Sequence, residues 1–123
     1  MALRDLRRRL TEPVEKRHSD QLRERCAEQA GCTPMAEVAP RALVAVVGEV
    51  GRLRVVPRAG APSIEATLSD GTGSVVAVWT GRRELAGLVP GRRVVISGRG
   101  SPTGPAQRLL YLNPAYELLE PGG

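Results

Sequence analysis

Residues 66–79, ATLSDGTGSVVAVW, decide the fold of this chain of 123 residues. Apolar side chains alternate with Glu and Thr from Ile64 to Leu68, and mostly apolar, Val-rich sequence fills the run from Ser74 to Thr80. The Asp70-Gly71 pair between these runs is the strongest short-range signal for a β-hairpin. The stretch therefore predicts two adjacent antiparallel strands joined by a tight turn.

Three further runs with a period of two surround this hairpin. The first extends over Leu43–Val56, and we predict a β-bulge at Gly51 that bends this strand across two faces of a small barrel. The other two are Arg92–Arg99 and Arg108–Leu112, and the loop Ser101–Gln107, rich in Gly and Pro, separates them. The sequence therefore predicts five strands.

The segment Arg82–Leu88 follows the third strand and is long enough for about two turns of helix. Leu85 and Leu88 are three residues apart, so they would share one side of that helix. The predicted order is strand, strand, strand, short helix, strand, strand, with Tyr116–Leu119 extending the last strand. This order is typical of a mainly β, five-stranded Greek-key barrel, which we expect over about Leu43–Leu119.

The N-terminal segment is densely charged and predicts helix. Three leucines share one face of its first part, at positions 3, 6 and 10. Pro13 interrupts this stretch, and Thr11 is a candidate N-cap for a second helix that ends at Gly31. The apolar stripe of the second helix is narrow and consists of Leu22, Cys26 and Ala30. A stripe this thin buries little area, so we expect a segment that is loosely docked or partly disordered.

The change of pattern near Met35 sets the expected domain boundaries. We divide the chain into a helical extension (1–34), a barrel domain (35–119) and a C-terminal tail (120–123).

The charge of the chain favours an anionic partner. The formal net charge is +5, and residues 41–123 carry ten basic and six acidic side chains, all ten basic ones being Arg. Arg pairs with phosphate through two hydrogen bonds and stacks on bases, so this surplus favours nucleic acid. The alternative is an ordinary soluble basic domain.

Two cysteines are too few for a disulfide scaffold. No apolar run approaches the roughly 20 residues that span a membrane, and the N-terminus lacks the apolar core of a signal peptide. These features predict a cytoplasmic protein with no membrane partner.

The run 66–79, followed by LVPGRRVVISG at 88–98, resembles the OB-fold nucleic-acid-binding domain of the anticodon-binding type. That module recurs in aminoacyl-tRNA synthetases, branch-migration helicases and replicative polymerase subunits. Small free-standing proteins carrying it are common in actinobacteria, and the composition here is similar to theirs. The resemblance covers roughly residues 35–119. It implies a binding surface on the second and third strands, flanked by the loops Pro57–Ser63 and Gly100–Gln107.

The chain departs from that family in having one Trp, two Tyr and no Phe. Stacking on aromatic side chains contributes roughly 1–3 kcal/mol per base in such proteins, so binding here would depend mainly on Arg.

The candidate nucleic-acid-binding residues are those expected at the end of the first strand, on and just after the second and third strands, on the last strand and around the two flanking loops. They are Arg52, Arg54, Arg58, Thr67, Trp79, Arg82, Arg83, Arg99, Arg108 and Tyr111. For each arginine the alternative is a solvated surface charge, which on a strand edge also deters aggregation. Arg92 and Arg93 are less favoured, because they flank a turn expected at the far end of the barrel.

The sequence around the three aromatic residues predicts where their side chains point. Counting by two from Val75 places Trp79 in the core, whereas a bulge near Gly81 would expose it for stacking. Tyr111 lies between two leucines and is expected to point away from them, towards a ligand. Tyr116 is expected to be a core or capping residue.

A metal site and catalysis are not expected. Only His18, Cys26 and Cys32 could serve as soft ligands, at irregular spacing and without a Cys-x-x-Cys pair. The Asp70–Gly73 loop precedes a strand and lacks Lys, so a hairpin is favoured over a phosphate-binding loop. No nucleophile motif or carboxylate pair appears, so the sequence predicts neither an enzyme nor a cofactor.

The sequence therefore predicts a largely sequence-independent binder of single-stranded DNA or RNA. Arg–phosphate contacts would provide most of the binding, with minor aromatic stacking. A protein-interaction module, docking a partner through the N-terminal helices, is the main alternative, and an accessory subunit of a nucleic-acid-processing complex is another.

Overall fold

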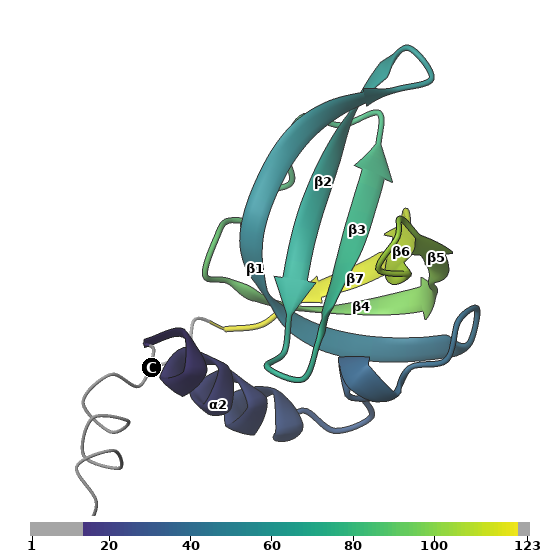
Figure 1. The fold of residues 1–123 in the computed structure, drawn as a ribbon. Coiled ribbons are helices and arrows are strands. Elements are labelled where there is room, and N and C mark those ends of the chain that lie inside the picture. The colour runs from purple at the N-terminus through teal and green to yellow at the C-terminus, as the bar shows by residue number, and fades with distance from the viewer. Residues whose placement is uncertain (1–13, 121–123) are drawn as a thin grey trace, which may run out of the picture.

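One α-helix, a short 3₁₀-helix and seven strands make up the part of the chain that the computed structural model describes, residues 14–120 (Figure 1). The helices are α2 (Val14–Ala27) and η1 (Met35–Glu37). The strands are β1 (Leu43–Arg58), β2 (Ala61–Ser69), β3 (Ser74–Thr80), β4 (Arg93–Arg99), β5 (Ser101–Thr103), β6 (Arg108–Leu112) and β7 (Ala115–Leu118). The expectation of a mainly β chain with an N-terminal helix is therefore confirmed.

All seven strands belong to a single sheet of order β5-β6-β3-β2-β1-β4-β7, which curls into a half-barrel (Figure 1). Neighbouring strands are antiparallel except β3 and β6, which are parallel. Only Gly100 separates β4 from β5, and only Asn113 and Pro114 separate β6 from β7. The two strands at the ends of the sheet therefore continue strands from its interior, which brings those ends towards each other.

The predicted number of five strands is wrong, because two short strands accompany the five. β5 forms inside the segment predicted to be a loop, and β7 is separate from β6. The breaks have local causes. A Cβ atom on Gly100 would lie 2.9 Å from the ring of Tyr111, and Asn113 has a left-handed backbone with φ of 48°. At both breaks the chain changes direction, and the short strand that follows pairs with a different neighbour: β5 with β6, and β7 with β4.

The helix predicted over residues 82–88 is also wrong, since none of these residues is helical and only Ala86 and Gly87 form a turn. Gly81 and Gly87 both have positive φ, at 76° and 80°, so only five residues lie between two backbone reversals. That length is too short to nucleate a helix. Leu85 and Leu88 nevertheless share a side, because the amide of Leu88 donates to the carbonyl of Leu85 (3.0 Å) and both side chains enter the core.

The core lies on the inner face of the curled sheet and is almost entirely aliphatic. Its largest cluster includes inward residues at every second position of β1, β2, β3 and β4, such as Val46, Leu68, Ala77 and Ile96. The bulge predicted at Gly51 is confirmed by a register shift between Val50 and Arg52. Val50 and Leu53 are three positions apart, so in a regular strand they would point to opposite faces. The extra residue at the bulge restores the alternation, and Leu53 lies on the inner face like Val50.

The helix α2 packs on the outer surface of β1 (Figure 1). Its buried residues Leu22 and Cys26 form a small cluster with Val47, so two of the three residues of the predicted stripe are confirmed as its buried face. Arg23 Nη2 donates to the carbonyl of Gly71 (3.1 Å), which ties the helix to the β2–β3 hairpin. The predicted first helix, with its leucines at 3, 6 and 10, lies outside the described residues. Neither helix within residues 14–120 is long and apolar enough to cross a membrane.

Candidate nucleic-acid interface

The outer face of four neighbouring strands carries two rows of aligned side chains. Residues opposite each other in a β ladder point to the same side of the sheet, so the register defines the rows. From β1 through β2 and β3 to β6, one row is Arg52, Thr67, Val76 and Leu110, and the next is Arg54, Glu65, Val78 and Leu112. The face is therefore basic at β1, polar on β2 and aliphatic on β3 and β6.

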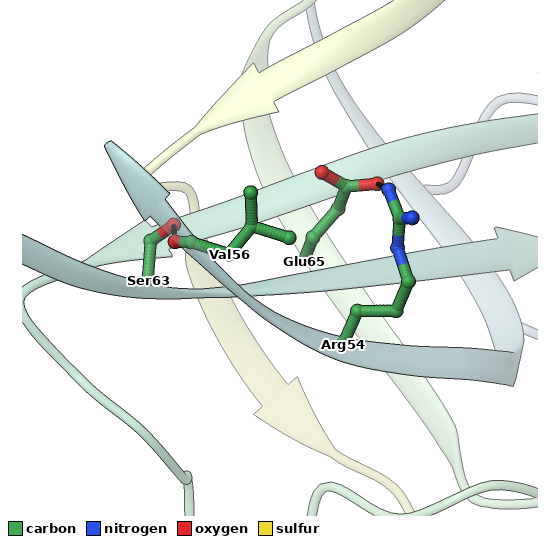
Figure 2. A network of polar contacts seen from close by, with 4 residues as sticks. All are labelled: Arg54, Val56, Ser63 and Glu65. Atoms are coloured by element: carbon green, nitrogen blue, oxygen red, sulfur yellow. Dashed lines mark hydrogen bonds and ion pairs between the residues drawn. The ribbon is translucent and has the colours of Figure 1, made fainter.

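Arg54 is held by an ion pair on this face. Its Nη2 lies 2.8 Å from Oε1 of Glu65, and the two side chains are 49% and 22% exposed (Figure 2). Figure 2 also shows the neighbouring contact, in which the Ser63 hydroxyl donates to the carbonyl of Val56. Glu65 was not among the predicted site residues, although it lies two positions from Thr67 on the same strand and therefore on the same face.

The β1–β2 hairpin displays a third arginine beyond this pair. Arg58 is exposed and pairs with Ala61 across a two-residue turn, Ala59-Gly60, in which both residues have positive φ (49° and 80°). Such a turn matches the twist of the strands it joins. Arg52, Arg54 and Arg58 thus line the same end of β1. Arg52 and Arg54 point outwards as predicted from the inward position of Leu53, whereas Arg58, predicted in the loop 57–63, is the last residue of the strand.

Arg82 and Arg83 follow β3 and are both exposed. Arg83 lines a small cavity together with Arg54 and with apolar residues of β1 and of the turn segment. The structure therefore brings the Arg82–Arg83 pair to the side of the barrel that carries the arginines of β1.

Arg99 and Arg108 lie elsewhere. Arg99 pairs with Leu43 at the start of β1, and its Nη1 donates to the carbonyl of Arg41 (2.9 Å). This engagement with its own backbone, at the opposite end of β1 from Arg54, separates Arg99 from the other predicted arginines. Arg108 is exposed at the start of β6, opposite Thr103. The expectation that these two residues bracket one binding loop is met only in part, since Arg108 alone adjoins the turn at 104–107.

The structure corrects the role expected of two aromatic residues. Tyr111 is 1% exposed and points into the core, so the prediction that it faces a ligand is wrong. Its hydroxyl is buried without a hydrogen-bond partner, and burial raises its pKa. Trp79 is 5% exposed, and its Nε1 donates to the carbonyl of Pro114 (3.1 Å). The inward interpretation of Trp79 is thus the one the structure supports, and its inclusion as a stacking residue is wrong.

Tyr116 packs against Trp79 edge-on, with ring centroids 5.5 Å apart, and is 40% exposed. It lies on β7, away from the two rows, so the rows carry no aromatic side chain.

The Asp70 loop is structural. Asp70 Oδ1 accepts hydrogen bonds from the amides of Thr72 (2.8 Å) and Gly73 (3.1 Å), and also from the Thr72 hydroxyl. Its Oδ2 accepts one from the amide of Met35 (2.8 Å). The carboxylate is therefore occupied by its own hairpin and by η1, as expected for a turn and not for a phosphate-binding loop.

No cluster of three or more metal-ligating residues occurs among residues 14–120. Cys26 and Cys32 both border a cavity beside α2. Burial raises the pKa of Cys26 to about 11 and also raises that of Cys32, so both thiols stay protonated near neutral pH.

Comparisons with known proteins bear on the fold. No protein-family model matches the chain, and no curated protein matches it. Among solved structures it is similar to RecG, in a structure described as RecG bound to a three-way DNA junction. The match has a TM-score of 0.58 and 18% identity, and covers 74% of this chain and 12% of the RecG chain. The chain thus shares its β fold with a small part of a protein that binds DNA.

Proposed function

We propose that the chain is an OB-fold protein of the anticodon-binding type that binds single-stranded nucleic acid across the outer face of β1, β2 and β3. The observation that carries this proposal is the gathering of five exposed arginines around one end of that face. They are Arg52, Arg54, Arg58, Arg82 and Arg83. The fold shared with a DNA-binding protein supports the same proposal.

The mechanism follows from the side chains available. Guanidinium groups neutralise phosphates and release counterions, which gives binding without sequence preference. Thr67 adds a hydroxyl between the arginines and the aliphatic part of the face, where Leu112 is 56% exposed. Because the rows lack aromatic rings, stacking contributes little, and bases contact the exposed Leu112 of β6, since Val76 and Val78 of β3 are buried. The proposal assigns binding to this face and no catalytic step.

The direct test is fluorescence anisotropy of labelled oligo-dT, oligo-rU and a duplex at several salt concentrations. We expect single strands to bind with a log–log salt slope of about −0.7 per phosphate contacted. The double variant Arg52→Ala/Arg58→Ala removes two such contacts and should reduce the slope by about 1.4. Arg17→Ala on the exposed surface of α2 is the control, because it removes the same kind of charge at a distance from the face.

Two results would contradict the proposal. One is an absence of binding to every strand at low salt, and the other is binding that salt does not weaken. The first result would favour a protein-interaction module, for which the exposed Leu112 beside Leu110 is a suitable contact.

A further inference from the structure

A small cavity opens at the end of the barrel, between β1 and the turn segment 81–92. Its volume is about 120 Å³. Leu53, Val55 and Ile64 line it from the sheet, and Leu85 and Leu88 line it from the turn segment. Three charged residues complete the lining, Arg54, Arg83 and Glu84. The lining thus combines five aliphatic residues with two arginines and one glutamate.

The turn segment creates this cavity. Gly87 adopts φ of 80°, and a turn closed by the Leu88 amide carries Leu85 and Leu88 to the barrel, where both are buried. Leu53 on the facing strand is only partly buried, and Val55 in the lining is 56% exposed. Apolar surface therefore remains uncovered at this end of the barrel.

The size of the cavity limits what it can hold. A cavity of about 150 Å³ lined by Leu, Ile and Phe accepts benzene. A cavity of about 120 Å³ with a largely aliphatic floor is a closer match to one six-membered ring than to a fused pair of rings.

The charges around the cavity indicate what such a ring would be attached to. Arg54 belongs both to the second row of the outer face and to the lining of the cavity, so the two sites are continuous. The two arginines outnumber the one acidic residue of the lining, Glu84, and this surplus of positive charge next to an apolar floor suits a ring that is joined to an anionic backbone.

We propose that this cavity receives one pyrimidine base, turned away from the outer face, of a single strand whose phosphates lie at Arg54 and Arg83. This inference rests on the proposed function and adds to it a preference for pyrimidines at one position. Single-stranded substrate favours such an arrangement, because turning a base out of a single strand breaks no base pair.

The test compares oligo-dT with a strand of the same length in which every base is removed and only sugars and phosphates remain. We expect the wild-type protein to bind oligo-dT roughly tenfold more tightly than the abasic strand. Leu53→Phe places a larger ring in the cavity and should lower the affinity for oligo-dT to that for the abasic strand, leaving the latter unchanged. Leu53→Met is the matched control, since it keeps the volume of the side chain.

A second measurement does not depend on a folded variant. Wild-type protein is crosslinked to a strand containing 4-thiothymidine, and the modified peptides are mapped. Crosslinks to 53–55, Ile64 or 83–88 support the inference, whereas crosslinks confined to 65–80 would overturn it.

The outcomes separate the two proposals. Salt-sensitive binding with equal affinity for oligo-dT and the abasic strand overturns the pyrimidine cavity and leaves the proposed function in place. An absence of binding to all strands overturns both. Salt-sensitive binding of an acidic peptide with an apolar side chain, in preference to any strand, would assign the cavity to a protein partner instead.

Discussion

Replacing Glu65 by Gln is expected to tighten the binding of single-stranded nucleic acid. The carboxylate lies in the middle of the proposed face and holds Arg54 at 2.8 Å. A phosphate that binds Arg54 must therefore compete with Glu65 and also approach its negative charge. The neutral amide of a glutamine side chain would remove both obstacles while keeping nearly the same shape.

The size of the effect follows from the exposure of the pair. Arg54 and Glu65 are 49% and 22% exposed, and an ion pair of this kind contributes about 0.2–1 kcal/mol. A carboxylate about 6 Å from a phosphate in water adds a repulsion of about 0.7 kcal/mol. Together these terms give about 0.9–1.7 kcal/mol, which corresponds to a roughly four- to sixteenfold tighter dissociation constant at low salt.

The assay is anisotropy of labelled oligo-dT with the wild type and Glu65→Gln over a range of salt concentrations. If Arg54 gains a phosphate, the salt slope should steepen by about 0.7. Glu117→Gln on the exposed surface of β7 is the control, because it changes the net charge by the same amount elsewhere. Equal tightening by the two variants, or weaker binding by Glu65→Gln, would refute the assignment of Arg54 to the phosphate-binding face.

Three further predictions concern the scaffold. Gly71→Ala should undock α2, because a Cβ atom there would collide with the carbonyl of Ser19. In denaturant unfolding it should lower the free energy of unfolding more than Gly104→Ala does, since Gly104 has a similar positive φ but open space and its replacement costs only backbone strain of about 1–2 kcal/mol. Asp70→Ala should lower the free energy of unfolding by about 3 kcal/mol or more, since four donors lose a charged acceptor, and calorimetry showing a change below about 1 kcal/mol would contradict this role. Cys26 should react slowly with iodoacetamide below pH 9, because burial raises its pKa from 9.0 to about 11. For the same reason its contribution to stability should be complete below pH 9 and decline as the pH rises towards 11, and Cys26→Ala should remove this decline.

The strands were predictable because their signals are local. Alternating residues, the Asp70-Gly71 turn and the bulge at Gly51 all depend on a few neighbouring positions, and the structure confirms each of them. The conformation of the segment 82–88 was not predictable, since the three-residue spacing of Leu85 and Leu88 fits a helix as well as a turn. Gly81 before the segment and Gly87 within it prevent a helix, because both adopt a positive φ that the spacing of the leucines does not reveal.

The candidate site was predictable in its position on β1 and less so in its members. Alternation along β6 correctly predicted that Tyr111 and its neighbours Leu110 and Leu112 point to opposite faces of the strand. It was wrong about which of these faces is the inner one. The ring occupies space left by Gly98 and Gly100, and that space depends on how β4, β5 and β6 pair. Likewise, the involvement of Arg99 with the carbonyl of Arg41 joins residues 58 positions apart, which no local pattern could indicate.

The long strand β1 has a consequence for how binding could be detected. Leu43 to Glu49 pair with β4, and Glu49 to Arg58 pair with β2, so one strand belongs to both halves of the sheet. Loss of either half leaves β1 with an unpaired edge, which favours a single cooperative melting transition. A ligand that binds only the β1–β2 end of the folded protein should therefore raise the melting temperature of the entire barrel, in proportion to the logarithm of its concentration once it exceeds the Kd.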